Sequence, residues 1–368
     1  MRKGWEYKRW KEVLTIINGK NQSAVVDKNG EYPIYGSGGI MGYANNWLCP
    51  ENCVIIGRKG NINKPIFVET KFWNVDTAFG LNANIEYLLP KFLFYFCLDY
   101  NFERHNKAVT IPSLTKADLL KIDIPLPPKS TQLAIVSELD KINELIRLKK
   151  EQLKDFDNLA QSLFYEMFGD PVENEKGWEV KKIGDLALVK TGPFGSMLHK
   201  EDYICDGIPL VNPIHMKDYK IVPDLDFTIS KEKASELENY LLKRNDVVFA
   251  RRGDIGRCAI VSEAEQGFIC GTGSLFVRFS KEIESIFIMY IIRCDSFSKH
   301  LISKAKGATM LNINSNTIAD LRIPLPPLPL QRLFAQRIEQ IEREKSEVQK
   351  SIQDLETLLA SRMQYWFE

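Results

Sequence analysis

The stretch Ile124-Pro125-Leu126-Pro127-Pro128 recurs 199 residues later as Ile323-Pro324-Leu325-Pro326-Pro327, and each copy is followed by a Gln and about forty residues of heptad-patterned sequence. A second repeat, Gly4-Trp5-Glu6 and Gly177-Trp178-Glu179, opens each copy at an offset of 173. Because the offset grows by 26 between these markers, the second copy is longer, while the segments after the prolines keep step. The sequence therefore predicts two copies of one unit, each a variable domain followed by a helix of fixed length.

Composition indicates a globular, two-domain chain. Its 368 residues, of which 44% are hydrophobic and 26% charged, suit two domains plus connectors. The net charge is only +1, so any nucleic-acid binding would depend on local clusters of basic residues. Seven scattered cysteines and a start without an apolar signal segment lead us to expect a cytoplasmic protein with free thiols. The most apolar stretch, 87–98, is too short to cross a bilayer, so no membrane partner is expected.

The segments after the two proline pairs carry a 4-3 alternation of apolar residues, which is typical of a coiled-coil seam. Lys149, Lys345 and Arg362 are its polar breaks. Pro128 and Pro327 mark the start of each helix, and Gly169 with Pro171 predicts the end of the first. The predicted seam consists of Ile135, Leu139, Ile142, Ile146, Leu153, Phe156, Leu163, Phe334, Ile338, Ile341, Val348, Ile352, Leu355 and Leu359.

Connectivity predicts how these helices pair. The first leaves domain one and arrives at domain two, so the second must run back antiparallel to bury its seam, giving a pseudo-twofold internal repeat. At ~1.5 Å per residue such a helix spans roughly 57 Å, which suits DNA sites separated by about a dozen base pairs. The alternative, that the helices merely dimerise the protein, would not require duplication of the whole unit.

The predicted fold is α+β, with two β-rich α/β domains separated by two long antiparallel coiled-coil helices. We place the domains at 1–129 and 169–328 and the helices at 130–168 and 329–368. Within domain one, strands are expected at 53–57, 64–69 and 76–81, and a helix at 88–101 with a counterpart at 283–303.

A basic, glycine-containing loop recurs between strands in both copies. Glycine lets the backbone approach a ligand closely, and guanidinium or ammonium groups suit a DNA phosphate or groove edge. The alternative, an ordinary charged hairpin, is weakened by the recurrence. The candidate DNA contacts in these loops are Arg58, Lys59, Asn61, Asn63 and Lys64 in the first copy, and Arg251, Arg252, Asp254 and Arg257 in the second.

Other turn-rich segments supply further candidate DNA contacts. The glycine-rich stretch 35–42 lacks the Gly-Lys-Ser/Thr ending of a phosphate-binding loop, so a nucleotide site there is not favoured. Asn and Lys side chains can read a groove, although in turns they are as often simply solvated. These additional candidates are Tyr35, Ser37, Thr110, Lys200, Asn212, His215, Lys217, Lys306 and Thr309.

Catalytic patterns are missing from the sequence. Pro223-Asp224 has no Glu-x-Lys partner within forty residues, and no Asn-Pro-Pro-aromatic or Asp-Pro-Pro-aromatic element for amino-methyl transfer occurs. The four histidines stand singly, and one Cys-x-x-x-Cys has no second ligand pair nearby. The chain is therefore expected to have no catalytic residues and to bind no metal or cofactor itself.

With these features the chain closely resembles the specificity subunit of Type I restriction-modification enzymes, through the two IPLPP-helix segments and the stretches 35–42 and 193–212. The resemblance implies that each domain reads one half of a split double-stranded DNA target, while the helices set the spacer and dock two methyltransferase (modification) subunits. It also implies S-adenosylmethionine, ATP and Mg²⁺ on partner subunits, which methylate adenine or, as restriction subunits, translocate and cut. The competing hypotheses are a coiled-coil scaffold that touches no DNA and, less favoured, a self-contained nuclease or methyltransferase.

Overall fold

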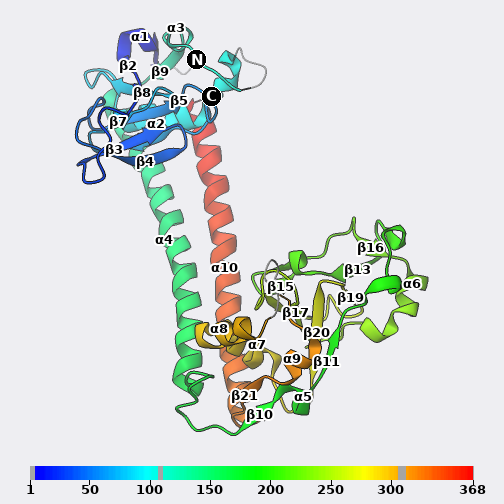
Figure 1. Ribbon diagram of the computed structural model, residues 1–368. Helices are drawn as coiled ribbons and strands as arrows, with labels where there is room; N and C mark the ends of the chain where they lie inside the picture. Colours follow the sequence, from blue (N-terminus) through cyan, green and yellow to red (C-terminus); the bar gives the residue numbers. More distant parts are fainter. Residues whose placement is uncertain (1–4, 107–110, 306–311, 368) are drawn as a thin grey trace. The chain divides into compact units, whose positions relative to one another are not determined.

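The chain forms two compact units, and the computed structural model describes its residues 5–106, 111–305 and 312–367 (Figure 1). The first unit comprises Met1–Glu151 with Val348–Glu368, and the second comprises Gln152–Glu347. Two 40-residue helices, α4 (Lys129–Phe168) and α10 (Leu328–Phe367), each contribute one part to each unit. The helices predicted from the repeat are thus present, and each begins one residue earlier than expected.

The first unit carries its domain ahead of α4. Its strands are β1 (Glu6–Arg9), β2 (Leu14–Asn18), β3 (Tyr32–Gly36), β4 (Gly39–Ala44), β5 (Cys53–Gly57), β6 (Ile66–Val68), β7 (Trp73–Asn74), β8 (Ala78–Ala83) and β9 (Asp123–Leu126). Its short helices are α1 (Trp10–Val13), α2 (Pro90–Asp99), the 3-10 helix η1 (Phe102–His105) and α3 (Lys116–Leu119).

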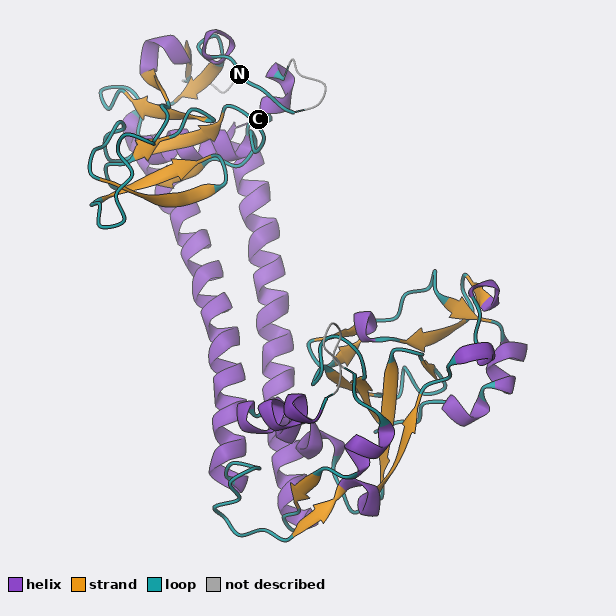
Figure 2. Cartoon of the chain, viewed as in Figure 1, coloured by secondary structure: helices purple, strands orange, loops and turns teal. Residues whose placement is uncertain are grey.

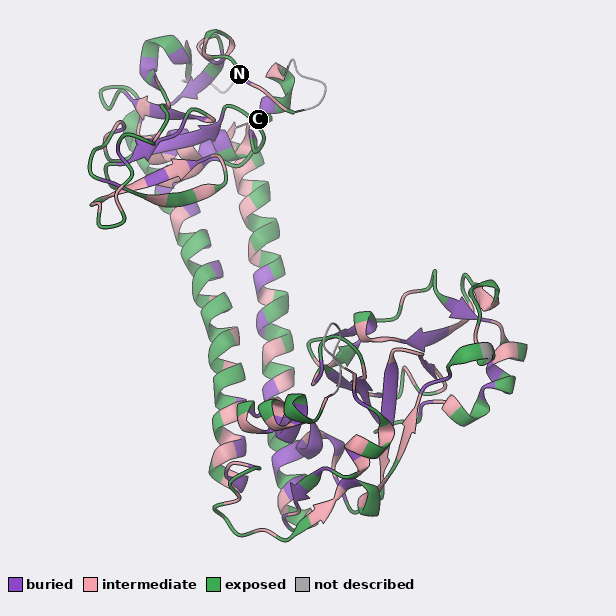
Figure 3. Cartoon of the chain, in the orientation of Figure 1, coloured by how far each residue is buried: buried purple, intermediate pink, exposed green. Residues whose placement is uncertain are grey.

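Two small sheets and a two-stranded ladder build this domain (Figure 2). One sheet is antiparallel with the order β2-β8-β5-β6, and α2 packs against it. The other has the order β4-β3-β7, with β3 parallel to β7. The ladder pairs β1 with β9 and so joins the Gly-Trp-Glu segment to Ile124-Pro125-Leu126. Strand β5 is buried along its whole length, as its unbroken apolar run predicts (Figure 3).

The second unit has a longer set of elements. Its strands are β10 (Val180–Lys182), β11 (Ala187–Thr191), β12 (Tyr203–Ile204), β13 (Ile208–Val211), β14 (Met216–Lys217), β15 (Lys220–Ile221), β16 (Thr228–Ile229), β17 (Val247–Ala250), β18 (Cys258–Ile260), β19 (Ile269–Cys270), β20 (Ser274–Phe279) and β21 (Arg322–Pro324). Its helices are α5 (Ile183–Leu186), η2 (Gly195–Met197), η3 (Lys200–Asp202), η4 (Pro213–His215), α6 (Lys231–Glu236), η5 (Glu238–Tyr240), α7 (Ser285–Arg293), α8 (Asp295–Lys304) and α9 (Ser315–Ala319).

The strand pairing of the first unit recurs in the second. The order β11-β20-β17-β18 matches β2-β8-β5-β6, and the parallel pair β13 and β19 matches β3 and β7. The ladder of β10 with β21 again joins the Trp-Glu segment to the proline motif. The internal repeat read from the sequence is therefore a repeat of structure.

Most of the length difference lies between the third strand of the repeat and the basic loop. The offset between equivalent residues is 176 at Tyr35 and Val211, which occupy the same parallel register, and 193 at Arg58 and Arg251. In the second unit this interval holds the hairpin of β14 and β15, then β16, α6 and η5. Apart from the strand that leads into the loop in both units, β5 or β17, the first unit has only β4 there.

Within each unit, α4 and α10 run antiparallel. In the first unit Glu138 of α4 bonds to Arg362 of α10, and further along α4 Lys150 meets Glu356, which lies earlier in α10, at 2.8 Å. In the second unit Asp157 meets Lys345 at 2.8 Å. The polar breaks Arg362 and Lys345 in the seam are thus ion-paired across the helices, and the predicted seam residues are all buried or half-buried.

The first helix ends where the sequence predicts. Gly169 has φ of +78°, and its N–H donates to the carbonyl of Tyr165 at 2.9 Å, which closes the last turn. Nearer that end the buried side chains of α4 are Ala160, which fits the heptad, and Phe164 and Phe168; Phe164 lies one residue beyond the predicted Leu163, which is half-buried. The reason is a second contact: Phe164 packs on Phe287 and Tyr290 of the domain as well as on α10.

None of the helices within the described ranges has an apolar run long enough to cross a lipid bilayer.

Candidate nucleic-acid interface

The basic loop of the first unit, Arg58–Lys64, connects β5 to β6. Its first residue is held by backbone hydrogen bonds to two other segments of the domain. Arg58 donates its N–H to Thr77 (2.8 Å) and accepts from Leu114 (2.9 Å). Gly60 has φ of +78°, a conformation that glycine adopts without strain, and Ile62 is buried beneath the loop. Because this anchor points inwards, the residues around it are turned to solvent.

The loop Arg251–Arg257 of the second unit, between β17 and β18, has the same construction. Arg251 donates to Gly273 (3.0 Å) and accepts from Ile313 (2.9 Å), while Gly253 has φ of +75° and Ile255 is buried. The two loops thus agree in conformation as well as in sequence, 193 residues apart, as the recurrence predicted.

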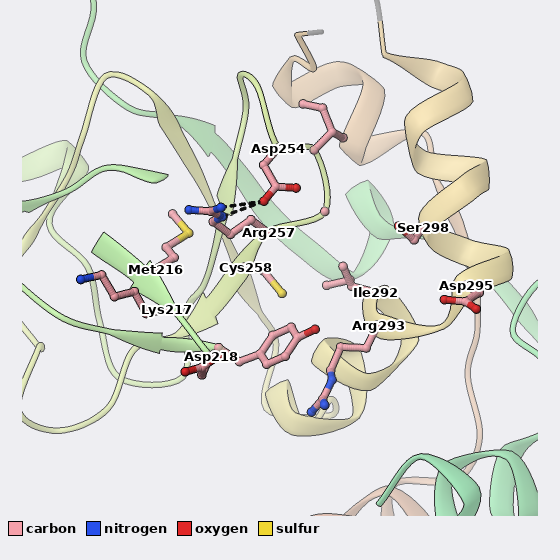
Figure 4. Close-up of a pocket in the computed structure, with 13 residues that line it drawn as sticks. Met216, Lys217, Asp218, Asp254, Arg257, Cys258, Ile292, Arg293, Asp295 and Ser298 are labelled. Carbon is pink, nitrogen blue, oxygen red and sulfur yellow. Dashed lines mark hydrogen bonds and ion pairs between the residues drawn. The ribbon is translucent and has the colours of Figure 1, made fainter. Parts of the chain in front are cut away.

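The two loops differ in whether their charged side chains form an ion pair within the loop. In the first unit Arg58, Lys59 and Lys64 are exposed. In the second, Arg257 is bound to Asp254 at 2.8 Å, as Figure 4 shows. Asp254 takes the position of the neutral Asn61. Its carboxylate neutralises Arg257, so among the described residues of the second loop the positive charge that is left is that of Arg251 and Arg252.

Arg251 is the most constrained of these basic groups. Its Nε is buried without a hydrogen-bond partner among the described residues, and the pKa of its guanidinium is lowered, first by burial and then by repulsion from Arg252. The neighbouring Asn312 likewise has a buried Oδ1 without a described partner. Unmatched buried donors and acceptors are costly in a folded protein, so a group that satisfied these two would stabilise the segment.

The segments before the long helices lie beside these loops. Lys59 forms a β-bridge with Ser113, and Arg252 forms one with Asn312. Ser113 and Asn312 were not predicted from the sequence, although aligning the two copies on their proline motifs pairs them, 199 residues apart. The candidates Thr110, Lys306 and Thr309 lie outside the described residues.

The glycine-rich stretch of the first unit forms a hairpin next to the basic loop. Strands β3 and β4 are joined by Ser37 and Gly38, and a Cβ placed on Gly38 would lie 3.8 Å from Nδ2 of Asn61. Ser37 is half-buried, and Tyr35 packs edge-on against Phe72 at 5.6 Å. The structure thus brings Ser37 and Asn61 to one surface, while the ring of Tyr35 is engaged in packing.

Asn63 and His215 have structural roles in this arrangement. Asn63 accepts from the N–H of Phe102 (2.8 Å), at the start of η1. His215 is buried, with Nδ1 2.7 Å from the carbonyl of Leu210, so its ring lies away from solvent and holds the turn after β13. Asn212 serves the same turn, accepting from the N–H of Gly273 at 3.1 Å.

The two remaining lysine candidates lie on different parts of the second unit. Lys200 is exposed in η3, and Asp202 of the same turn pairs with Lys233 of α6 at 3.5 Å, which ties it to α6. Lys217 lies in β14 and lines an open cavity of about 670 Å³ bounded by the basic loop and by α7 and α8 (Figure 4). Arginines and aspartates both line this cavity, so it favours neither an anion nor a cation.

No group of three or more His, Cys, Asp or Glu side chains that could hold a metal ion is found within 5–106, 111–305 and 312–367. The seven cysteines are unpaired, and burial raises the pKa of the Cys258 thiol to about 12.

The repeat, the paired helices and the recurrent basic loops agree with what a comparison of families finds. Residues 2–155 and 175–357 match the family model described as the Type I restriction modification DNA specificity domain. The chain belongs to this specificity-domain family. Each matched segment includes one domain and much of the long helix that follows it, so the family unit is the repeat unit defined above.

Curated specificity subunits are similar to this specificity-family chain over most of its length. The Type I restriction enzyme MjaVIII specificity subunit of Methanocaldococcus jannaschii is 22% identical, covering 96% of this chain and 92% of its own. The EcoDI specificity subunit of Escherichia coli is 20% identical over 95% of this chain and 83% of its own.

Solved structures agree in fold with this member of the specificity family. The S subunit of a Type I restriction-modification system from M. genitalium superposes with a TM-score of 0.60 at 15% identity, covering 99% of this chain and 96% of that one. A chain from a structure of complex assembly in a Type I system gives 0.65 at 18% identity, covering 99% and 97%. These likenesses support the predicted two-domain, two-helix architecture.

Proposed function

We propose that this chain is the noncatalytic DNA-recognition subunit of a Type I restriction-modification complex, in which each domain reads one half of a bipartite double-stranded target. The observation that carries the proposal is the recurrence of one basic loop, with the same backbone conformation and flanking bridges, in two copies of one domain. A single binding surface would not require two such loops.

The long helices are proposed to set the spacer between the half-sites. Each is uninterrupted over 40 residues, a length of about 60 Å at the standard rise of an α-helix. Residues of α4 belong to the buried cores of both units, and α10 contributes buried residues to the core of the second unit and partly buried ones to that of the first.

The same helices are proposed to dock two methyltransferase subunits. Leu159 on α4 and Leu358 on α10 are 199 residues apart, so they hold equivalent positions in the repeat, and both are about half-exposed. Other leucines of these helices, such as Leu145 and Leu333, are exposed as well, but Leu159 and Leu358 have the advantage of forming an equivalent pair. Two equivalent positions suit two copies of one partner. The methyl transfer and ATP-dependent cleavage, with S-adenosylmethionine, ATP and Mg²⁺, are proposed to belong to methyltransferase and restriction subunits.

The test is selection from a random-sequence DNA library by the chain together with its methyltransferase partner. The expected result is enrichment of a two-part motif with a fixed gap. A single contiguous motif, or no enrichment while the partner still binds, would instead favour the scaffold hypothesis.

A second measurement concerns the chain alone. Because its net charge is only +1, the partner is expected to supply much of the phosphate contact. Filter binding at physiological salt should therefore show weak DNA binding by the chain and much tighter binding by the complex. Equal affinity of the two would contradict this division of contacts.

A further inference from the structure

Ile214 is the most exposed large apolar side chain of the described second unit, at 69%. It stands at the centre of the turn η4, between Pro213 and the buried His215. The turn is held on both sides, by the His215 ring on the Leu210 carbonyl and by the Asn212 side chain on the N–H of Gly273. The backbone thus fixes an apolar group outwards instead of letting it fold back. Single exposed apolar residues are common, so exposure alone indicates nothing.

The hydrogen bonds around Ile214 connect its turn to the basic loop. The carbonyl of Pro213, the preceding residue, accepts from Nη1 of Arg257 at 3.2 Å, so the turn is bonded directly to the basic loop. Gly273 joins them a second time, because its N–H donates to Asn212 and its carbonyl accepts from Arg251. The turn that carries Ile214 is therefore joined to both ends of the basic loop, directly at Arg257 and through Gly273 at Arg251.

The first unit repeats this arrangement with different residues. Strand β3 corresponds to β13, and the chain after it turns at Gly38, beside Asn61 of the basic loop. Just past that turn, Ile40 and Met41 are 57% and 64% exposed. Both copies of the domain thus carry an exposed apolar side chain in the segment that follows this strand and approaches the basic loop, although the segments differ in length and sequence.

We propose that Ile214 contacts the C5-methyl group of a thymine in the major groove, in the half-site read by the second unit. This inference rests on the proposed function. The thymine methyl is the one apolar group that the base pairs present in the major groove, and a short aliphatic side chain is its natural complement. A wedge between base pairs would need to unstack a step, typically from the minor groove. The turn of Ile214 is bonded to a loop that carries Arg251 and Arg252, and arginine is the common partner of guanine edges in the major groove, which favours the methyl contact.

The experiment replaces each thymine of that half-site in turn by deoxyuracil, which removes only the methyl group, and measures the Kd of the assembled complex. At one position the wild-type complex should lose about fourfold in affinity, the factor expected for burying one methyl-sized group. Ile214→Ala should weaken binding to the thymine target by at least that factor and should be insensitive to uracil there. Leu188→Ala is the matched control, since Leu188 is an exposed aliphatic residue near the opposite end of β11 from this surface.

Several outcomes would overturn the proposal. A half-site without thymine would do so, and so would equal uracil sensitivity of the wild-type and Ile214→Ala complexes. A third outcome uses 2-aminopurine, a fluorescent base, placed in the half-site. An increase in its fluorescence on binding that Ile214→Ala abolishes would indicate that the side chain is a wedge between base pairs. Thermal melting of Ile214→Ala that matches wild type shows that the variant is folded. If selection yields a two-part motif without methyl sensitivity, only this inference fails; if it yields no such motif, the proposed function fails as well.

Discussion

Gln132 and Gln331 hold the same position in the two halves of the molecule and share two equivalent hydrogen bonds, to which Gln132 adds one to the carbonyl of Tyr87. Both side chains are fully buried, at the start of α4 and α10. Gln132 accepts from the N–H of Leu89 and donates to the carbonyl of Pro127, at 2.9 and 3.0 Å. Gln331 accepts from Glu284 and donates to Pro326, at 3.1 and 2.8 Å. Each glutamine thus fixes a long helix to the residue that precedes the main helix of its domain.

Replacing either glutamine by leucine should destabilise the unit to which it belongs. The substitution removes the partners of a partly buried backbone N–H and of a buried carbonyl, and an unmatched buried group costs about 1–3 kcal/mol. Chemical denaturation followed by circular dichroism measures the loss. Gln336→Leu, an exposed glutamine on α10, is the control and should change stability little. If Gln132→Leu were no worse than this control, the proposed clamp would have no energetic role.

Phe164→Ala should be among the most damaging changes in the second unit. The ring is 1% exposed and packs on Phe168, Phe287 and Phe334, so its removal should cost about 3–5 kcal/mol. Leu163→Ala, at the neighbouring half-buried position, should cost clearly less. The denaturation midpoints of the two variants show which of the two positions lies at the centre of the buried face. A larger loss of stability in Leu163→Ala than in Phe164→Ala would support the simple heptad instead.

This one-residue shift marks how far sequence patterns reach. The heptad, the proline motifs and the duplication are local or repeated signals, and they were sufficient for the fold class, both helices and their antiparallel pairing. The position of Phe164 depends on Phe287 and Tyr290, more than 120 residues away, which no periodicity reports.

The candidate interface was likewise predictable only in part from the sequence. The basic loops were predictable because they recur, with glycine where φ is positive. The structural roles of Asn63 and His215 were not, because a polar side chain in a turn has the same signature whether it binds a ligand or caps a helix. The placement of Ile214 beside Arg257 likewise depends on a bond between segments 44 residues apart.

Acid should weaken the helix pair of the first unit through Glu138. A hydrogen bond from Arg362 lowers the pKa of this carboxylate, against a smaller opposing effect of burial, and the Trp366 indole also donates to it. Because the folded pKa is depressed, the stabilisation is fully present above the unfolded value of about 4.3 and is lost as pH falls through the folded pKa.

Thermal melts of wild type and Glu138→Gln between pH 7 and pH 3 test this linkage. The wild type should be the more stable protein above about pH 5. The difference in melting temperature between the two proteins should shrink as the pH falls below the pKa of an unfolded Glu. A difference that stays constant with pH would exclude the ion pair as its cause.

Charge placed at the equivalent leucines should reduce partner docking one site at a time. Leu159→Glu and Leu358→Glu should each leave a complex with one methyltransferase subunit, and the double variant should bind none, because a carboxylate in an apolar contact is desolvated without a partner. Native mass spectrometry counts the bound subunits. Circular dichroism should remain unchanged, since both side chains face solvent in the free chain. Full occupancy in the double variant would place docking elsewhere.

The most direct test of two independent reading surfaces compares Arg251→Ala with Arg252→Ala in one complex and Arg58→Ala with Lys59→Ala in another, each used for selection on random DNA. The account predicts that the first double variant loses sequence preference in one half-site, the second loses it in the other, and the gap stays the same. Equal weakening of both half-sites by either variant, or preference unchanged in both, would contradict it.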